Sequence, residues 1–218
     1  MSGLQLVDFR GFPSDDTPLH SVIAHLECGG LLAYPTETVY GFGGIPDQTV
    51  IRDLRRLKER NPTKAMLLLI PNRASVEDLV WTQEALDMAE VFWPGSVTLV
   101  LSDPCSRYPE GLRSSEGNVA VRVSPHPLVR ALVEGVGPIL STSANRSGQL
   151  PALDAQSSLE TARAMGVGEE MWVLDGGVLD PSLPSTVVDC SGSAPTILRE
   201  GAIPLGQVRR VLPDINTA

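Results

Sequence analysis

Residues 52–64 concentrate positive charge in a chain that is acidic as a whole. The segment holds six lysines or arginines and two acidic residues, a local charge of +4, whereas the net charge of the chain is −9 and the other residues carry −13. Both lysines of the chain, Lys58 and Lys64, lie in it. Fixed cations of this kind suit phosphate or carboxylate groups. The segment predicts an anion-binding site, and a solvated basic helix face is the alternative.

Lys58 is the cation whose position is most informative. A helix is predicted over 48–60, and its apolar residues between Val50 and Leu57 fall in one sector about 120° wide, because successive residues turn by about 100°. Lys58 falls inside that sector, and Arg60 lies at its flank. A lysine on the buried side of a helix is costly unless its ammonium group reaches water or an anion. Lys58 is therefore either a functional cation or a residue that snorkels at the helix end.

A glycine-rich segment with polar side chains follows a predicted buried strand at 30–34. Residues 35–44 (PTETVYGFGG) supply hydroxyls, one carboxylate and three glycines, and open α/β sheets bind ligands at the carboxyl ends of their strands. The segment matches neither GxxxxGK[ST] nor a GxGxxG that opens a helix, so the glycines alone do not indicate a nucleotide site. A tight strand-to-helix turn remains the alternative.

Three further segments carry polar groups at the ends of predicted strands. Residues 141–148 (STSANRSG) hold four hydroxyls, one amide and one guanidinium, a set suited to phosphate oxygens, although a capped turn would use the same residues. Ser185 and Thr186 begin another strand, and Arg199 ends the last one. Arg122 lies within a strand pattern at 119–123, where an arginine needs an anionic partner or an edge position.

The elements that must position these residues alternate incompletely between strands and helices. We predict strands over 30–34, 66–70, 97–101, 119–123, 138–141, 171–174, 186–189 and 196–199. We predict helices over 48–60, 82–92, 126–134, 157–165 and 205–212, with Asp47 and Asp154 as N-caps. Some strands follow one another with only loops between them, so hairpin or long-loop connections join the βαβ units. The pattern predicts an α/β protein, with an open, twisted mixed sheet and flanking helices in a single domain over 1–218.

Composition excludes several classes of protein. The longest apolar run, residues 65–70, is too short for a membrane span, and the N-terminus lacks the features of a secretion signal, so we expect a cytoplasmic protein that does not cross a membrane. Three cysteines without CxxC spacing and three histidines without HExxH or HxH spacing predict neither a disulfide framework nor a metal centre. GxSxG is absent, so a serine-hydrolase site is not supported.

Taken together, the polar segments resemble the YrdC family of threonylcarbamoyl-adenylate synthases. The resemblance spans residues 31–201, in order along the chain, and this chain is similar to the short, single-domain form of the family. Its motif-bearing core covers about 20–205. The motifs that carry it are residues 35–41 (PTETVYG), 58–60 (KER), 92–95 (FWPG) with Thr98, 121–123 (VRV), 143–145 (SAN) with Ser147 and Gly148, 185–189 (STVVD) and 198–201 (LREG).

The resemblance implies a nucleotidyltransferase reaction in which L-threonine, bicarbonate and ATP give threonylcarbamoyl-AMP and pyrophosphate, with Mg²⁺. A downstream threonylcarbamoyl transferase complex would use the product to form threonylcarbamoyladenosine in tRNA. Such a fold has a concave cavity. Lys58 and Arg60 would be catalytic. The nucleotide would contact these two residues together with Asn118, Ser143, Asn145 and Arg199. Threonine would contact Thr36, Arg122, Ser141 and Ser185.

Two other functions remain open at this stage. The basic segment would also suit an RNA-binding module without chemistry, but the remaining charge of −13 predicts weak, salt-dependent binding and no stable nucleic-acid complex. YrdC-like domains also occur in carbamoyltransferases, where they work beside zinc-finger and acylphosphatase-like parts. This chain of 218 residues has no CxxC pair for the former.

Overall fold

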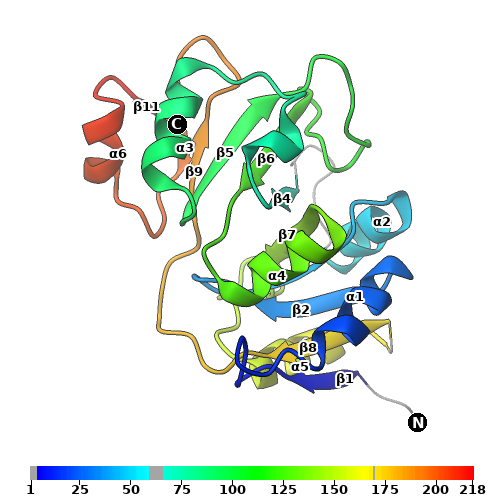
Figure 1. The fold of residues 1–218 in the computed structure, drawn as a ribbon. Helices are drawn as coiled ribbons and strands as arrows, with labels where there is room; N and C mark the ends of the chain where they lie inside the picture. The colour runs from blue at the N-terminus through cyan, green and yellow to red at the C-terminus, as the bar shows by residue number, and fades with distance from the viewer. Residues whose placement is uncertain (1–3, 59–65, 169) are drawn as a thin grey trace.

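The computed structural model describes residues 4–58, 66–168 and 170–218, and its strands form one mixed sheet (Figure 1). The strands are β1 (Gln5–Asp8), β2 (Leu31–Pro35), β3 (Tyr40–Gly44), β4 (Leu67–Leu69), β5 (Val97–Ser102), β6 (Asn118–Arg122), β7 (Ile139–Ser143), β8 (Met171–Asp175), β9 (Thr186–Asp189), β10 (Thr196–Arg199) and β11 (Asn216–Thr217). Their order in the sheet is β1-β8-β2-β3-β7-β4-β6-β5-β9-β10-β11. The expected open mixed sheet is confirmed.

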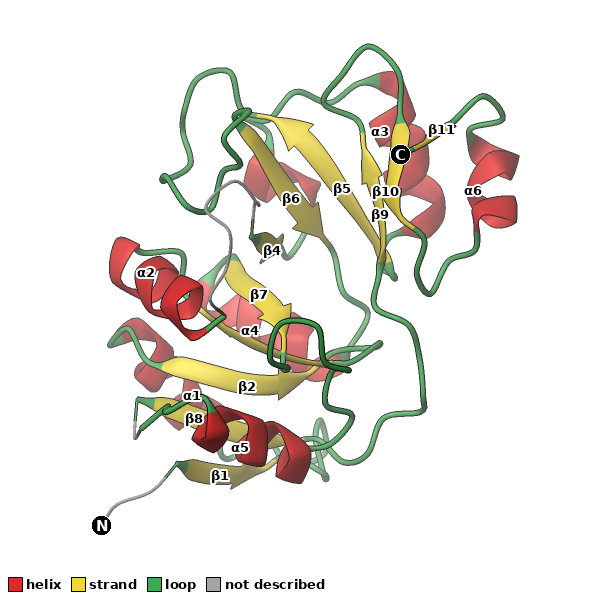
Figure 2. Cartoon of the chain, turned by 180° about the vertical axis from the view of Figure 1, so that it is seen from behind, coloured by secondary structure: helices red, strands yellow, loops and turns green. Residues whose placement is uncertain are grey.

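Helices cover both faces of the sheet, but not over its whole length. They are α1 (Leu19–Glu27), α2 (Gln48–Leu57), α3 (Gln83–Phe92), α4 (Pro127–Val136), α5 (Ala155–Ala164) and α6 (Leu205–Val211), with a short 3₁₀ helix at Arg73–Val76. Figure 1 shows α1, α3 and α4 in front of the sheet. Figure 2, from behind, shows α2 and α5 in front of the half that contains β8 and β2, whereas β5 and β6 face the viewer with α3 behind them. The second face of β5 and β6 is therefore open to form a site.

Four predicted helices, α2, α3, α4 and α6, begin within one residue of the predicted start, and α5 begins two residues earlier than predicted, at Ala155. Asp47 Oδ1 accepts hydrogen bonds from the backbone N–H groups of Thr49 and Val50 at 2.7 and 2.9 Å, and Asp154 caps α5 in the same way. Such caps satisfy N–H groups that have no partner within the helix. Helix α2 ends at Leu57, earlier than the predicted end at residue 60, and residues 59 and 60 lie outside the described part of the chain.

Strand β3 is the main error of the prediction. Residues 40–44 were expected to form a loop, but they pair with β2 and β7 on both sides. A Cβ added to Gly43 would lie 2.0 Å from the carbonyl oxygen of Leu140, so the glycine permits the close approach of the two strands. The segment is therefore a hairpin with β2, and it neither cradles a phosphate nor leads directly into a helix.

Besides β3, the elements absent from the predicted ranges are β1, α1, β11 and the 3₁₀ helix at Arg73–Val76. Strands β1 and β11 lie at the two edges of the sheet and are largely exposed, so they lack the apolar run of a central strand. Helix α1 buries Val22 and Leu26, and its remaining residues show a weak apolar pattern.

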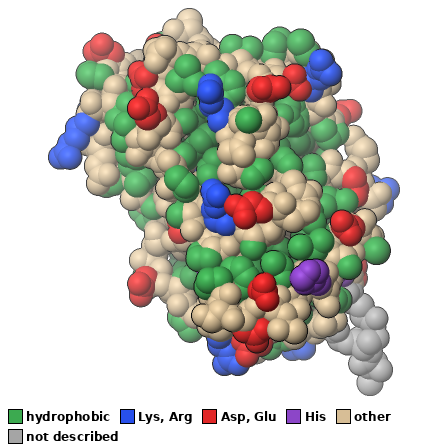
Figure 3. Space-filling view, viewed as in Figure 1, with side chains coloured by type: hydrophobic (Ala, Val, Ile, Leu, Met, Phe, Trp, Pro, Cys, Tyr) green, Lys and Arg blue, Asp and Glu red, His purple; other side chains and the backbone are tan. Residues whose placement is uncertain are grey.

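No helix in the described part of the chain has the length and apolar character needed to cross a bilayer. On the face that Figure 3 shows, Lys and Arg side chains are interspersed with Asp and Glu. The described residues on this face therefore form no continuous basic surface of the kind that binds nucleic acid.

Candidate active site

A cavity of about 580 Å³ lies against the open face of the sheet. Strand residues alternate between the two faces, so β6 directs Asn118 and Arg122 into the cavity and turns Val119 and Val121 toward the core. Strand β9 and the residue before it direct Ser185, Val187 and Asp189 into the same space.

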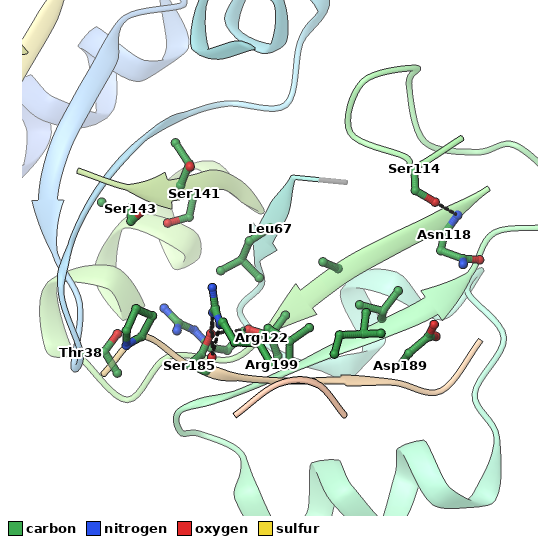
Figure 4. Close-up of a pocket in the computed structure, with 18 of the residues that line it drawn as sticks. Thr38, Leu67, Ser114, Asn118, Arg122, Ser141, Ser143, Ser185, Asp189 and Arg199 are labelled. Atoms are coloured by element: carbon green, nitrogen blue, oxygen red, sulfur yellow. Dashed lines mark hydrogen bonds between the residues drawn. The ribbon is translucent and has the colours of Figure 1, made fainter. Parts of the chain in front are cut away.

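The polar groups of the cavity lie at two ends (Figure 4). Arg122, Arg199 and Ser185 lie close together at one end with Thr38, while Asn118 and Ser114 lie at the other end of β6. In this view Ser141 and Ser143, from β7, lie above Thr38, and Leu67 lies between them and Asn118. About 13 Å separates the two ends of β6, since a strand rises about 3.3 Å per residue. The cavity is therefore long enough for a ligand with chemically distinct ends.

Arg122 lies almost fully inside the protein, with 3% of its surface exposed. Its Nη1 is 3.5 Å from Glu37 Oε1, so the expected anionic partner is confirmed. Glu37 also accepts hydrogen bonds from Ser124 Oγ at 2.6 Å and Ser96 Oγ at 3.2 Å. Arg122 Nε has no hydrogen-bond partner among the described residues. A buried guanidinium N–H without a partner is a donor that an anionic ligand can satisfy.

Arg199 lies at the same end as Arg122. It donates to the carbonyl oxygen of Ser185 from Nε (3.1 Å) and Nη2 (2.7 Å), and Nη2 is 3.3 Å from Ser185 Oγ. The Ser185 hydroxyl also meets Thr98 Oγ1 at 2.9 Å. Partial burial, and secondly the positive charge of Arg122, lower the pKa of Arg199. Two cations at one end of the cavity favour the binding of an anion between them.

Lys58 crosses from the end of α2 to the loop after β7. Its Nζ donates to the carbonyl oxygens of Ser143, at 2.9 Å, and Asn145, and to Asn145 Oδ1 at 2.6 Å. Ser143 Oγ donates to the same Oδ1 at 2.6 Å. The predicted inward position of Lys58 on the helix is thus confirmed: the residue is 8% exposed, and its side chain points toward oxygen acceptors at the edge of the cavity.

Thr36 and Ser141 line the cavity, and the Thr36 hydroxyl also makes hydrogen bonds to the backbone of the turn that follows it. Thr36 Oγ1 donates to the carbonyl oxygen of Val39 at 2.8 Å and accepts from the N–H of Thr38 at 3.2 Å. These bonds fix the turn between β2 and β3. A Cβ on Gly41 would lie 3.0 Å from Ser141 Oγ, so Gly41 leaves space in front of that hydroxyl.

The structure brings most of the predicted site together. Seven of the ten predicted residues line the cavity, and Lys58 and Asn145 adjoin it through Ser143; Arg60 lies outside the described residues. The seven are Thr36, Asn118, Arg122, Ser141, Ser143, Ser185 and Arg199.

Other lining residues were missed. Thr98, Ser114, Glu116 and Asp189 line the cavity but were not proposed as site residues. Side chains alternate between the two faces of a strand, so the choice of Ser185 as a site residue also points to Asp189 on β9, and the same alternation places Thr98 of β5 on the cavity face. Ser114 and Glu116 come from the loop between β5 and β6, and only the fold places them here.

Comparison with known proteins identifies the family. Residues 24–201 match the Sua5/YciO/YrdC family model, which is described as "Telomere recombination". A threonylcarbamoyl-AMP synthase of Chromohalobacter salexigens is 39% identical over 77% of this chain and 89% of its own length. The chain belongs to the Sua5/YciO/YrdC family.

Solved structures agree with this assignment. P. abyssi Sua5, in complex with L-threonine, superposes with a TM-score of 0.87 at 28% identity. The match covers 100% of this chain and 63% of that one, so this chain spans somewhat less than two thirds of the Sua5 chain. E. coli YciO, with a TM-score of 0.81 and 22% identity over 95% of this chain and all of YciO, shares the fold.

Proposed function

We propose that this protein is a nucleotidyltransferase that makes L-threonylcarbamoyladenylate from L-threonine, bicarbonate and ATP, with release of pyrophosphate. The observation that carries the proposal is that one cavity is lined by residues assigned to both substrates. Arg122, Ser141 and Ser185 come from the set assigned to threonine, and Asn118 and Ser143 come from the set assigned to the nucleotide.

The reaction needs charge stabilisation more than a protein nucleophile. The amine of threonine takes up the carbon of bicarbonate with loss of water, and an oxygen of the resulting carbamate attacks the α-phosphorus of ATP. The bond to pyrophosphate breaks in the same step, and pyrophosphate leaves with the electron pair. Negative charge develops on the phosphate oxygens, where fixed cations and N–H donors lower the barrier. The proposal gives that role to Lys58 and Arg60.

The end of the cavity with Arg122 suits the amino acid. The guanidinium of Arg122, which lines the cavity, is a charged donor for the threonine carboxylate. Ser141 and Ser185 offer hydroxyls in the lining of the cavity, and Thr36 adds a further contact. Arg199, although assigned to the nucleotide, lies beside Ser185 and Arg122, so its charge acts where the two substrates meet.

Mg²⁺ would enter with ATP. Among the described residues, no group of three or more His, Cys, Asp or Glu side chains is placed to hold a metal ion. Mg²⁺ usually binds through one or two carboxylates together with substrate phosphates, and Glu116 and Asp189 line the cavity. This donor set fits a Mg²⁺ ion carried by the nucleotide. The product would then pass to a threonylcarbamoyl transferase complex that modifies tRNA.

The direct test is a mass-spectrometric assay of the purified protein with ATP, Mg²⁺, bicarbonate and L-threonine, in which each component is omitted in turn. We expect threonylcarbamoyl-AMP and pyrophosphate only in the complete mixture. Product formed from serine or glycine in place of threonine would change the assigned substrate. ATP binding without any such product would overturn the proposed reaction.

A further inference from the structure

We propose that Glu37 is a positioning residue for the amino-acid substrate: its carboxylate fixes the guanidinium of Arg122 in the wall of the cavity. The proposal rests on the proposed function, because Arg122 is assigned there to the threonine carboxylate. Glu37 itself is not among the residues that line the cavity, so it acts through Arg122.

In the turn between β2 and β3, the side chain of Glu37 points in a different direction from those of Thr36 and Thr38. Thr36 and Thr38 are both buried and line the cavity, whereas Glu37 points to the partners behind it. The hydrogen bonds of Thr36 Oγ1 to Val39 and Thr38 hold the turn in this conformation. The backbone of Glu37 is thereby fixed before its side chain makes any contact.

The carboxylate of Glu37 joins three segments. Ser124 Oγ donates to Oε2 at 2.6 Å, Ser96 Oγ donates to Oε1 at 3.2 Å, and Arg122 Nη1 lies 3.5 Å from the same Oε1. Ser96 precedes β5, and Ser124 follows β6. The two hydroxyls hold the carboxylate in place, and the carboxylate in turn holds one end of the Arg122 guanidinium. Its Nε remains without a partner among the described residues.

The pairing of the strands shows that this contact depends on the shape of the sheet. The turn that carries Glu37 lies beyond Ser143, at the carboxyl end of β7. Arg122 pairs with Leu69 on β4, and Leu69 pairs with Ile139, so Arg122 is level with the opposite end of β7. In a flat sheet the two positions would be about 20 Å apart, given about 4.8 Å between strands and 3.3 Å per residue.

The twist and curvature of the sheet remove that separation. Figure 1 shows β2 running across the view and β5 and β6 running in a clearly different direction. The Glu37–Arg122 contact therefore ties the two halves of the curved sheet together at the amino-acid end of the cavity. A displacement there of about 1 Å is enough to weaken a substrate contact.

The proposal predicts a selective loss of threonine affinity. Glu37→Gln keeps the shape of the side chain and one acceptor oxygen, and its amide N–H can donate to the other serine hydroxyl, but it removes the charge that holds Arg122. We expect Kd for L-threonine, measured by calorimetry, to rise about 10-fold, with Kd for ATP changed by less than 2-fold. We also expect KM for threonine to rise by a similar factor with kcat within about 3-fold of wild type.

Glu134→Gln is the matched control. Glu134 pairs with Arg130 at 2.9 Å on α4, so the substitution makes the same chemical change in an ion pair outside the cavity lining. The threonine affinity of the Glu134→Gln protein is expected to equal that of the wild-type protein. Thermal unfolding of both variants separates loss of affinity from loss of fold.

A double-mutant cycle distinguishes positioning from a general structural role. If Glu37 acts through Arg122, Glu37→Gln has little further effect on threonine affinity in an Arg122→Gln background. Equal effects in the two backgrounds, or wild-type threonine affinity in Glu37→Gln, would overturn the positioning role while leaving the proposed function intact. A wild-type protein that neither binds threonine nor makes product would overturn both.

Discussion

Lys58 Nζ lies 2.6 Å from Asn145 Oδ1, although the two residues belong to α2 and to the loop after β7. The same ammonium also contacts the carbonyl oxygens of Ser143 and Asn145. Three oxygen acceptors around one buried cation place its charge at a fixed point on the edge of the cavity. A cation held in this way needs no reorganisation when phosphate charge develops beside it.

The first prediction is that Lys58→Met abolishes most of the activity. Methionine keeps an unbranched apolar side chain but removes the charge, and we expect formation of threonylcarbamoyl-AMP to fall about 100-fold or more. The carbonyl oxygens of Ser143 and Asn145 each lose the charged donor, although Ser143 keeps the N–H of Asn145, so the free energy of unfolding should also fall by about 1–3 kcal/mol.

Product formation and chemical denaturation, measured on the same preparation, check both parts. The matched control is Arg52→Met, an exposed position of the same helix, which should keep activity within 2-fold. A folded Lys58→Met protein with wild-type activity would contradict the catalytic role of Lys58.

The second prediction concerns Gly43 in β3. In Gly43→Ala the new methyl group would lie 2.0 Å from the Leu140 carbonyl oxygen, so β3 and β7 must move apart. We expect a loss of about 3 kcal/mol or more in the free energy of unfolding, since the obstacle is backbone and cannot change rotamer. Urea denaturation measures this loss.

Gly206→Ala in α6 serves as the control for that substitution. The new methyl group would have no heavy atom of the described residues within 4 Å. Alanine is also the better helix former, so stability should be unchanged or higher by about 0.5 kcal/mol. Equal unfolding midpoints for the two variants would contradict the assigned approach of β3 to β7.

The sequence was sufficient to predict elements whose signal is local. The central strands β4, β5 and β6 are short apolar runs, and the caps of α2 and α5 are single aspartates. The inward direction of Lys58 followed from its angle on one helix. Each of these features depends on residues within one or two turns of chain, so no knowledge of the tertiary fold was needed.

Features that depend on strand pairing could not be predicted in the same way. Strand β3 contains three glycines, which weaken any strand signal, and its pairing with β7 explains why they are tolerated. Glu37 was visible as a carboxylate after β2, but its contact with Arg122 requires the order and curvature of the whole sheet. The loop residues Ser114 and Glu116 reach the cavity for the same reason.

The third prediction is that Thr186→Val destabilises the protein and weakens its site. Thr186 Oγ1 donates to the carbonyl oxygen of Ile203 and accepts from the N–H groups of Gly201 and Ile203, at 2.5, 2.9 and 3.1 Å. Valine has nearly the same shape but leaves these backbone groups unpaired, so stability should fall by about 2–4 kcal/mol. This segment follows Arg199, so KM for the substrates should rise as well.

Denaturation curves and steady-state kinetics of Thr186→Val are compared with those of Thr196→Val on β10. Thr196 is half-buried on the strand next to β9, and its replacement should change stability by less than about 0.5 kcal/mol. A Thr186→Val protein as stable as that control would show that the hydroxyl of Thr186 does not hold this segment.

The last prediction concerns pH and His126. Burial lowers the pKa of His126 below its usual value of 6.5, an effect that the charge of Glu37 partly opposes, and its Nδ1 has no hydrogen-bond partner among the described residues. The folded state therefore favours the neutral imidazole. In the unfolded chain the residue binds a proton at higher pH than it does in the folded protein. The stability that depends on neutral His126 is present above about pH 6.5 and is lost as the pH falls through and below that value.

We expect the Tm of the wild-type protein to fall more between pH 7.5 and pH 5.0 than the Tm of His126→Gln, because glutamine does not titrate. The carboxylates are common to both proteins, so the difference between the two pH dependences isolates His126. Parallel Tm curves would show that His126 takes up its proton equally well in the folded and the unfolded chain.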